Sequence, residues 1–566
     1  MSAFLWLAIF LPAVCALRPS REVHTEQGTV QGFVETSNQK DVEIFLGIPY
    51  AEAPISKEDW FAPSKPALHW TGVRNTSEFA PSCWFPNARD LNNGQSLDCL
   101  YLNVFAPSWS SHSPPLPVLF YIHGGEYVSG TPEDFGDRAV AAILPARQDV
   151  IVVTMAYRFG ILGFYTTGDD TAPGNQGLWD LAEALRWTYN NIEHFGGDPR
   201  RITVGGHSTG SMSAEILSLS PVSKDMVHQL ILMSGTNDFQ WEPMKSEETF
   251  ENVKTFAHEY LNFTAKSNDT KTELSSFLQS QDPKDFEISY KYNGQERTLK
   301  MWASYDGKFI PDTIDKLRKQ SLRPATLVGC TRFEAILLAN VEGDNYYEEA
   351  KRTVIKQILR SQKYDDSKNQ RDAEEILSQF LQYSAKDNDT QQYWRNYTEL
   401  MSDVFFTTGI YKYVMEHVQV SERPIFVYRF DHYFSGHHNR RKIDGSTHAD
   451  DIPFVLGDYV INGEKFSAQD NIVLQQFSSF VGNFVKFGNP NGSPQIYGGQ
   501  EWTAVRRNTD KLDHFVYNYY ENGMSDNWFD GRHKKWIQIR EKYAKSAGVV
   551  KNSIFVLVLA WFVVHF

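Results

Sequence analysis

The sequence contains little cysteine, no surplus of positive charge and no apolar run long enough to cross a bilayer. Only 4 of its 566 residues are cysteines, which excludes a small scaffold held together by many disulfides. The 55 Lys and Arg residues are outnumbered by 69 Asp and Glu residues, giving a net charge of −14 at pH 7. A protein that neutralises phosphates is expected to be basic, so we expect no nucleic-acid partner. With 41% hydrophobic residues, the chain can instead bury a large globular core.

Both ends of the sequence have the character of processing signals. Residues 1–16 carry no charged side chain, include an apolar run and end in small residues suited to signal-peptidase cleavage. Residues 554–566 are nearly all apolar but fewer than the roughly 20 that a spanning helix requires. We expect a signal peptide at 1–16 and therefore a secreted protein or one on the extracellular face of the plasma membrane. For residues 549–566 three interpretations stay open: a GPI-anchor signal with a short spacer, a short tail anchor, or a tail that packs on the domain.

Cysteine usage and glycosylation motifs agree with export. Cys83 and Cys99 would close a short loop rich in Asn, Pro and Gly, so we expect one disulfide between them. Cys330 follows an apolar run and is expected to be a buried free thiol. Asn-x-Ser/Thr motifs predict glycosylation at Asn75, Asn262, Asn268, Asn388, Asn396 and Asn491, the last weakened by Pro494.

The pattern of strands and helices predicts an α/β fold. The sequence shows no linker, repeat or low-complexity tract, so we expect a single domain over residues 17–548. Short runs rich in β-branched and aromatic residues predict buried strands at 118–122, 151–155, 202–204, 230–233 and 425–430. Helix-like segments at 180–190 and 211–219 alternate with them. This alternation predicts a large, mostly parallel central sheet with helices on both faces.

The candidate nucleophile is Ser208, in the run Gly206-His207-Ser208-Thr209-Gly210. The run follows one predicted strand and precedes a predicted helix, so a sharp turn is expected between them. Such a turn exposes a serine hydroxyl, and the flanking glycines let other backbone approach without a Cβ clash. By itself the pattern also fits a glycine-rich turn with a capping serine.

The surroundings of this turn resemble those of one protein family. Phe195-Gly196-Gly197-Asp198-Pro199, residues 202–204 and the GHSTG run together fill the active-serine motif of the type-B carboxylesterase and cholinesterase family of α/β-hydrolases. Further matches cover nearly the whole mature chain, at residues 45–70, 98–104, 123–125, 172–178 and 487–491. The resemblance implies the α/β-hydrolase fold and a serine esterase that needs no metal and no organic cofactor.

The same resemblance implies the partners of the nucleophile. A serine hydroxyl needs a base to take its proton and an acid to orient that base. The base is implied to be His448 and the acid Glu334, although the family's usual Asn-x-Asp-Glu-Gly run here reads Thr-Arg-Phe-Glu-Ala. The order Ser208, Glu334, His448 is the one expected of this fold.

An oxyanion hole is also implied, and here the sequence departs from the family pattern. The expected donors are the backbone amides of Gly125, Glu126 and Thr209. Glu126 replaces the third small residue of a His-Gly-Gly-Gly or His-Gly-Gly-Ala run, and His207 replaces the Glu common before the nucleophile. A carboxylate facing the developing charge would oppose it by roughly 1 kcal/mol if solvated and by more if buried. The departure therefore bears on rate and substrate preference.

Two further departures are expected to affect structure alone. Many relatives have Arg and Glu where this sequence has Trp60 and Leu97, and losing both members of an ion pair together can be neutral for stability. Trp84 invites comparison with the cation-binding tryptophan of cholinesterases, but it directly follows Cys83. We expect it to be a core or loop aromatic.

The sequence therefore predicts an extracellular serine carboxylesterase that acts on a small-molecule ester. Two alternatives stay open. The first is a cholinesterase or lipid-ester hydrolase, which would share all of these residues. The second is a non-catalytic binding or adhesion protein of the same family, in which Glu126 prevents catalysis.

Overall fold

The structure, a computed structural model, describes residues 17–543 except 86–90, 92, 111, 239–240, 287–288, 293–294, 340–345, 360–365, 382–389, 434–443, 458–465, 493–500, 508 and 521. The predicted signal peptide at 1–16, the tail at 549–566 and the glycosylation motif at Asn388 lie outside the described residues.

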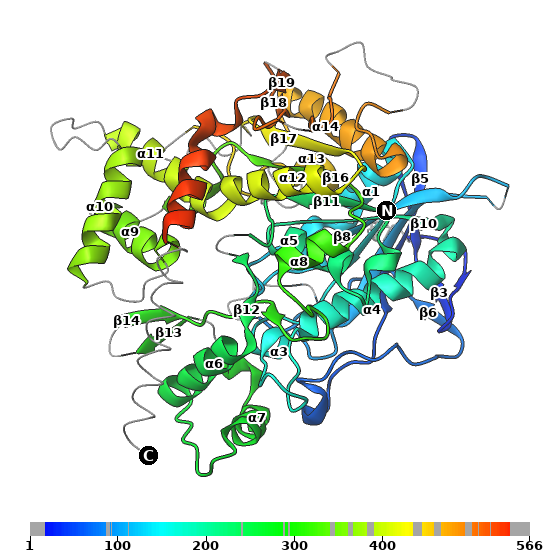
Figure 1. The fold of residues 1–566 in the computed structure, drawn as a ribbon. Coiled ribbons are helices and arrows are strands. Elements are labelled where there is room, and N and C mark those ends of the chain that lie inside the picture. The colour runs from blue at the N-terminus through cyan, green and yellow to red at the C-terminus, as the bar shows by residue number, and fades with distance from the viewer. Residues whose placement is uncertain are drawn as a thin grey trace, which may run out of the picture.

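One large sheet runs through the molecule (Figure 1). Its strands, in spatial order, are β1 (Arg18–Pro19), β4 (Phe33–Ser37), β5 (Lys40–Pro49), β7 (Tyr101–Pro107), β9 (Ile151–Met155), β8 (Leu116–Ile122), β10 (Gly197–His207), β11 (Gln229–Met233), β16 (Ala325–Thr331), β17 (Ile425–Phe430), β18 (His514–Tyr517) and β19 (Gly523–Ser525). The strands from β9 to β18 in this order are parallel, and antiparallel strands complete both edges. The predicted mostly parallel sheet is confirmed.

The central strands are buried on both faces. Along β8, Val118, Phe120 and Ile122 belong to one apolar cluster, while Leu119 and Tyr121 belong to another. Since successive side chains of a strand point to opposite faces, the two clusters lie on opposite sides of the sheet. Continuous apolar runs are what a sheet covered on both faces requires.

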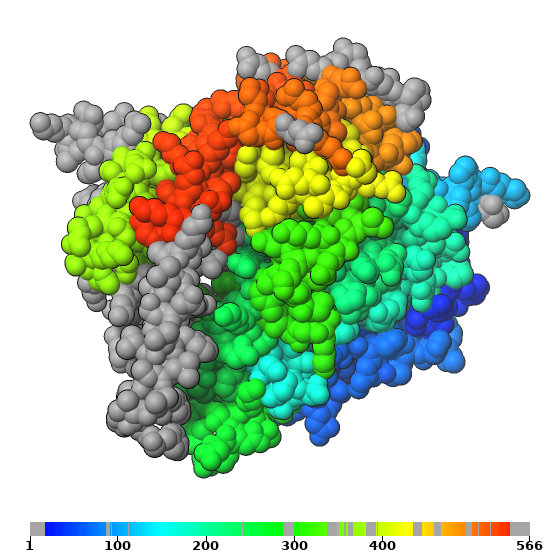
Figure 2. All heavy atoms as spheres, viewed as in Figure 1, coloured from blue at the N-terminus to red at the C-terminus, as the bar shows by residue number. Residues whose placement is uncertain are grey.

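Helices cover both faces of the sheet. The first cluster includes residues of α4 (Gln176–Asn191) and α5 (Thr209–Leu219). The second includes residues of α1 (Asp137–Ala142), α2 (Leu144–Gln148) and α14 (Ala468–Phe487). In the space-filling view the segments of α4, α8 (Ile314–Gln320) and α12 (Thr408–Val420) form a continuous surface over one side (Figure 2). The expected layered arrangement is therefore present.

The remaining elements surround this framework. The other helices are α3 (Gly160–Phe164), α6 (Ser246–Tyr260), α7 (Thr270–Ser280), α9 (Tyr346–Thr353), α10 (Ser367–Leu381), α11 (Thr390–Ser402), α13 (Pro453–Leu456) and the segment 532–543. Within the described ranges, three small sheets are formed: β2 (Val23–His24) with β3 (Thr29–Gln31) and β6 (Val73–Asn75); β12 (Met244–Lys245) with β15 (Ser304–Tyr305); and β13 (Ser289–Tyr292) with β14 (Gln295–Thr298). Among the described residues, no helix combines the length and the apolar character needed to span a bilayer.

The cysteines lie as the sequence predicts. Cys83 and Cys99 form a disulfide, and Cys330 in β16 is a buried free thiol. Trp60 is buried and Leu97 is half-buried against the same apolar cluster, so two apolar side chains occupy positions where the resemblance expected an ion pair.

The glycosylation motifs differ in exposure. Asn75, Asn262 and Asn268 are exposed, and Asn396 is half-buried. Asn491 is buried, and its side-chain amide both donates to the carbonyl of Trp502 and accepts from its N–H. A glycan on Asn491 would therefore have to displace these hydrogen bonds in the folded protein.

Candidate active site

Ser208 occupies a sharp turn between β10 and α5. Its φ of 57° is unusual for a residue other than glycine, and such strain is typical of functional turns. The turn is held on both sides, because the Ser208 N–H donates to the carbonyl of Met233 and the Ser208 carbonyl accepts from the N–H of Met212. The residue is 7% exposed and lines a pocket.

The two glycines around Ser208 are required by close packing. A Cβ on Gly206 would lie 2.5 Å from the carbonyl oxygen of Ile122, and one on Gly210 would lie 2.2 Å from the same oxygen. The end of β8 therefore passes directly against the turn, as the sequence pattern predicted. This approach brings the loop after β8 beside Ser208.

The structure joins Glu334 and His448 directly. The Nδ1 atom of His448 lies 2.5 Å from Oε2 of Glu334, whose side chain is fully buried. The other carboxylate oxygen, Oε1, accepts hydrogen bonds from the hydroxyl of Ser234 and from both the N–H and the hydroxyl of Thr331. These donors fix the orientation of the carboxylate.

The loop that carries His448 is docked on the segment that carries Glu334. The N–H of Phe333 donates to the carbonyl of Ser446, and the N–H of His448 donates to the carbonyl of Glu334. The Ser446 hydroxyl donates to the carbonyl of Phe430 at the end of β17. These hydrogen bonds attach the loop of His448 to the ends of the neighbouring strands β16 and β17, and so they fix the position of its imidazole.

Two aromatic rings contact the imidazole of His448. The ring of His207 lies 4.3 Å away between centroids, with an interplanar angle of 49°. The ring of Phe406, from the π-helical turn η9 (Asp403–Thr407), lies 4.8 Å away. Ser208 and His448 line the same pocket, but no hydrogen bond joins the Ser208 hydroxyl to the imidazole. Such bonds often tighten only when substrate binds.

The loop after β8 presents free amides near Ser208. Gly125 to Val128 form a tight turn in which the Val128 N–H donates to the Gly125 carbonyl, with φ of 57° at Glu126 and 60° at Tyr127. Over the part of the chain that the structure describes, the amides of Gly125, Glu126 and Thr209 have no hydrogen-bond acceptor. They are available as oxyanion donors. The Glu126 side chain is exposed, which is the arrangement in which its opposition to an oxyanion is smallest.

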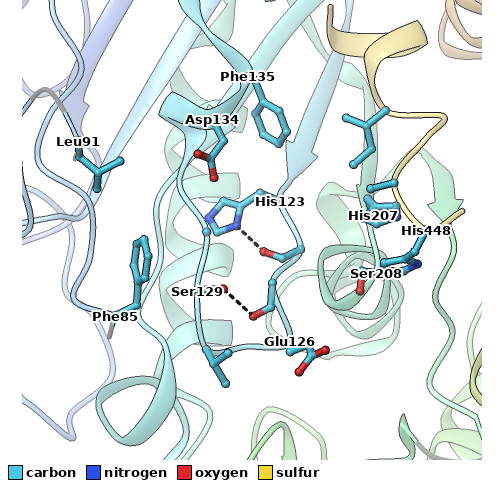
Figure 3. Close-up of a pocket in the computed structure, with 16 residues that line it drawn as sticks. Phe85, Leu91, His123, Glu126, Ser129, Asp134, Phe135, His207, Ser208 and His448 are labelled. Carbon is cyan, nitrogen blue, oxygen red and sulfur yellow. Dashed lines mark hydrogen bonds between the residues drawn. The ribbon is translucent and has the colours of Figure 1, made fainter. Parts of the chain in front are cut away.

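These groups share a cavity of about 580 Å³. In Figure 3, His207, Ser208 and His448 lie on one side of it, Phe85 and Leu91 on the other, and the turn with Glu126 between them. The lining combines apolar side chains with two carboxylates and three imidazoles: Phe85, Leu91, Val128, Phe135, Ala449 and Ile452 with Glu126, Asp134, His123, His207 and His448. Trp84 does not line this cavity and packs against the core, with the Lys284 ammonium 5.8 Å from its ring.

Burial controls the charge of several groups here. Burial lowers the pKa of His123 to about 4, so its ring is neutral near pH 7. Burial and the neighbouring His448 together hold the pKa of His207 well below its usual range. Burial raises the pKa of Asp451 to about 7; its carboxylate accepts a hydrogen bond from the Tyr428 hydroxyl. Glu334 contacts His448 directly, whereas the Asp451 side chain is hydrogen-bonded to the Tyr428 hydroxyl.

The structure brings Ser208, His448 and the loop with Gly125 and Glu126 to one cavity and places Glu334 in contact with His448. The residues that support them were not predicted. Ser234, which holds Glu334, and Phe406, which contacts His448, carried no recognisable signal because each is remote in the sequence from the residue it touches. The pocket residues Phe85 and Leu91 lie inside the predicted disulfide loop, which is the one hint available.

A mostly parallel sheet with a serine in a strand–turn–helix segment after one strand, and a glutamate and a histidine after two others, has the arrangement of an α/β-hydrolase. Comparison with known proteins identifies the family. A family model described as "Carboxylesterase family" matches residues 19–535, so the chain belongs to the carboxylesterase family and is a carboxylic ester hydrolase.

Curated relatives match over most of their length. Esterase cest-33 of Caenorhabditis elegans is 28% identical over 91% of this chain and 92% of its own. Pyrethroid hydrolase Ces2e of Rattus norvegicus is 30% identical over 86% of this chain and 84% of its own. An acylcarnitine hydrolase of Mus musculus is 29% identical, with 85% of each chain covered.

Proposed function

We propose that this protein hydrolyses carboxylic esters through a Ser208-His448-Glu334 triad and a covalent acyl-enzyme. The observation that carries the proposal is the buried Glu334 carboxylate, which contacts His448 at the edge of the cavity that holds Ser208. A carboxylate at Nδ1 keeps the proton on that nitrogen and leaves Nε2 as the base.

The reaction follows from these positions. His448 takes the proton of Ser208 as its oxygen bonds to the ester carbonyl carbon, and the amides of Gly125, Glu126 and Thr209 bind the oxyanion. The carbon–oxygen bond to the alcohol then breaks, and His448 protonates the leaving alkoxide. Water, deprotonated by His448, attacks the acyl group, and Ser208 leaves with its proton restored. Glu334 stabilises the imidazolium in both halves.

Labelling with an uncharged fluorophosphonate tests the proposal. We expect one covalent adduct per chain, located on Ser208 by peptide mass spectrometry, and hydrolysis of an uncharged p-nitrophenyl ester. S208A should abolish both, and H448A should slow both by at least about 10³-fold. A folded wild-type protein that forms no adduct and releases no p-nitrophenol would overturn the proposal in favour of a non-catalytic binding role.

The charges in the cavity favour one subset of esters. Glu126 and Asp134 contribute carboxylates to the lining, which includes no Lys or Arg among the described residues. A cationic group on a substrate would gain from this field, and an anionic one would lose. Esters with a cationic group are therefore our second, narrower candidate.

A pair of matched substrates tests this narrower candidate. A choline ester and its uncharged 3,3-dimethylbutyl analogue have the same shape and differ in charge. We expect kcat/KM to favour the choline ester, and E126Q to reduce that preference by roughly threefold to tenfold. An equal preference in wild-type protein would overturn it and leave general ester hydrolysis standing.

We also propose that the protein works outside the cell. The leader-like residues 1–16 and the Cys83–Cys99 disulfide support this location. Expression in cultured animal cells should give a protein that begins after residue 16, carries N-glycans and appears at the surface or in the medium. Release from the surface by a phosphatidylinositol-specific phospholipase would support a GPI anchor in place of residues 549–566; retention would oppose it.

A further inference from the structure

A second histidine ring, that of His207, contacts the imidazole of the proposed base. His207 is the last residue of β10 and is 4% exposed. Its ring lies 4.3 Å from that of His448 between centroids. Within the described structure its Nε2 atom is buried and has no hydrogen-bond partner. His207 therefore acts on its surroundings through ring contact rather than through a hydrogen bond from Nε2.

His207 is also uncharged. Burial and the neighbouring His448 hold the pKa of His207 well below its usual range, and two imidazolium rings at this separation would repel each other. When His448 takes the Ser208 proton, its positive charge forms beside the neutral aromatic ring of His207. Such a ring attracts a cation only moderately.

The other titratable groups around His448 come from three segments. Glu334, after β16, contacts Nδ1 directly. Asp450 and Asp451 follow His448 in its own loop, where Asp450 accepts from the Thr447 amide and Asp451 from Tyr428. His123 and Glu126, after β8, line the cavity. Among the described residues, only Glu334 offers His448 a carboxylate within hydrogen-bond distance.

We propose that His207 is a positioning residue for His448: a neutral ring that, together with Phe406, holds the imidazole in place and leaves Glu334 as its sole carboxylate partner. This inference rests on the proposed function. Its physical content has two parts. If the ring of His207 is removed, the imidazole of His448 is less well aligned with Ser208. If a carboxylate replaces that ring, it stabilises the protonated imidazolium of His448, so the neutral form that acts as the base is lost at a higher pH.

The rate of Ser208 labelling by an uncharged fluorophosphonate, measured against pH, separates the two parts. H207A should slow labelling about 10- to 100-fold because the ring is lost. H207F, which restores a ring without nitrogens, should recover most of that loss. H207E should move the acidic limb of the pH profile to higher pH by about one unit, which a purely structural role would not do. H69A, which removes an exposed histidine elsewhere, should match wild type in rate and profile.

Several outcomes would overturn the inference. They are wild-type labelling rates in H207A, equal losses in H207A and H207F, or an unmoved acidic limb in folded H207E. Thermal unfolding of each variant checks folding, and if H207E does not fold, the comparison of H207A with H207F decides. A wild-type protein that is not labelled at all would instead reject the proposed function, so the two failures are distinguishable.

Discussion

The two oxygens of Glu334 have different tasks: Oε2 lies 2.5 Å from Nδ1 of His448, while Oε1 accepts three hydrogen bonds from Ser234 and Thr331. The three donors lock the orientation of the carboxylate. The carboxylate is thus positioned by Ser234 and Thr331, which are not among the residues that line the cavity.

Glu334→Gln should impair catalysis severely while keeping the side chain's shape. The three donors will hold the amide oxygen of Gln, so its NH₂ group will face Nδ1 of His448. That contact favours the tautomer with the proton on Nε2, which cannot accept a proton from Ser208. We expect kcat to fall by about 10³- to 10⁴-fold. Steady-state hydrolysis of an uncharged ester measures this.

Ser234→Ala is the matched control for that variant. It removes one donor to Oε1 and leaves the carboxylate and the other two donors in place. We expect a loss of about tenfold or less in kcat. If the kcat of E334Q were no lower than that of S234A, the Glu334 carboxylate would not be the acid of a triad.

The sequence predicted the central framework well because its signals are local. The strands expected at 151–155 and 425–430 have the same bounds in the structure, and those expected at 118–122 and 230–233 are each extended at their amino ends. Short, continuous apolar runs of this kind are typical of strands buried on both faces and can be recognised without tertiary information. The edge strands were missed, since elements such as β1 and β19 are two or three residues long and only partly buried or exposed.

The residues of the site differ in how far the sequence alone could predict them. The Ser208 turn could be read from its glycines and flanking elements. His448 could not be chosen from sixteen histidines by periodicity and depended on the family resemblance. The contacts of Ser234 with Glu334 and of Phe406 with His448 link residues far apart in the chain. Such contacts depend on how strands and loops assemble, which no local pattern records.

Removal of the Cys83–Cys99 disulfide should weaken both stability and substrate binding. The bond closes a loop of about 16 residues, and a loop of this size contributes roughly 3 kcal/mol. Phe85 and Leu91 lie within that loop and line the cavity, so freeing it should also raise KM. Urea unfolding and steady-state kinetics of the C83S/C99S double variant measure the two effects.

Cys330→Ser is the companion variant for the disulfide experiment. Cys330 is a buried free thiol outside the loop. In C330S, reductant should therefore change stability and KM to the same extent as in wild type. A double variant with unchanged KM would show that the loop keeps its place in the cavity without the bond.

Glu126→Gly should speed hydrolysis of uncharged esters without loss of stability. Glu126 has a φ of 57°, which costs a residue with a Cβ roughly 1 kcal/mol and glycine almost nothing. Glu126 also lines the cavity, next to Gly125 in the loop of the proposed oxyanion donors. We expect up to about a tenfold gain in kcat/KM and equal or greater stability in urea.

Two further variants separate the charge of Glu126 from its backbone strain. E126Q removes the charge and keeps the side chain's size, so it should reproduce the kinetic gain without any gain in stability. E126A should behave like E126Q in rate while keeping the strained φ. Slower hydrolysis in all three would show that the Glu126 side chain assists the reaction.

Asp451→Asn should flatten the dependence of stability on pH. Burial raises the pKa of Asp451 to about 7 from an ordinary 3.8. Below pH 4 the carboxyl is protonated in both the folded and the unfolded chain. As the pH rises from about 4 to 7, the unfolded chain loses a proton that the folded chain retains, so the folded state loses stability across that interval, by roughly 1 kcal/mol per pH unit. Asn cannot titrate, so this loss should be absent from D451N.

Urea unfolding at pH 5, 6, 7 and 8 measures the difference between the two proteins. The stability of wild type relative to D451N should fall steadily up to about pH 7 and then level off. Tyr428→Phe removes the hydrogen bond that favours the charged carboxylate, so the decline should continue to higher pH in that variant. Parallel curves for wild type and D451N would mean that Asp451 is ionised in the folded protein throughout this range.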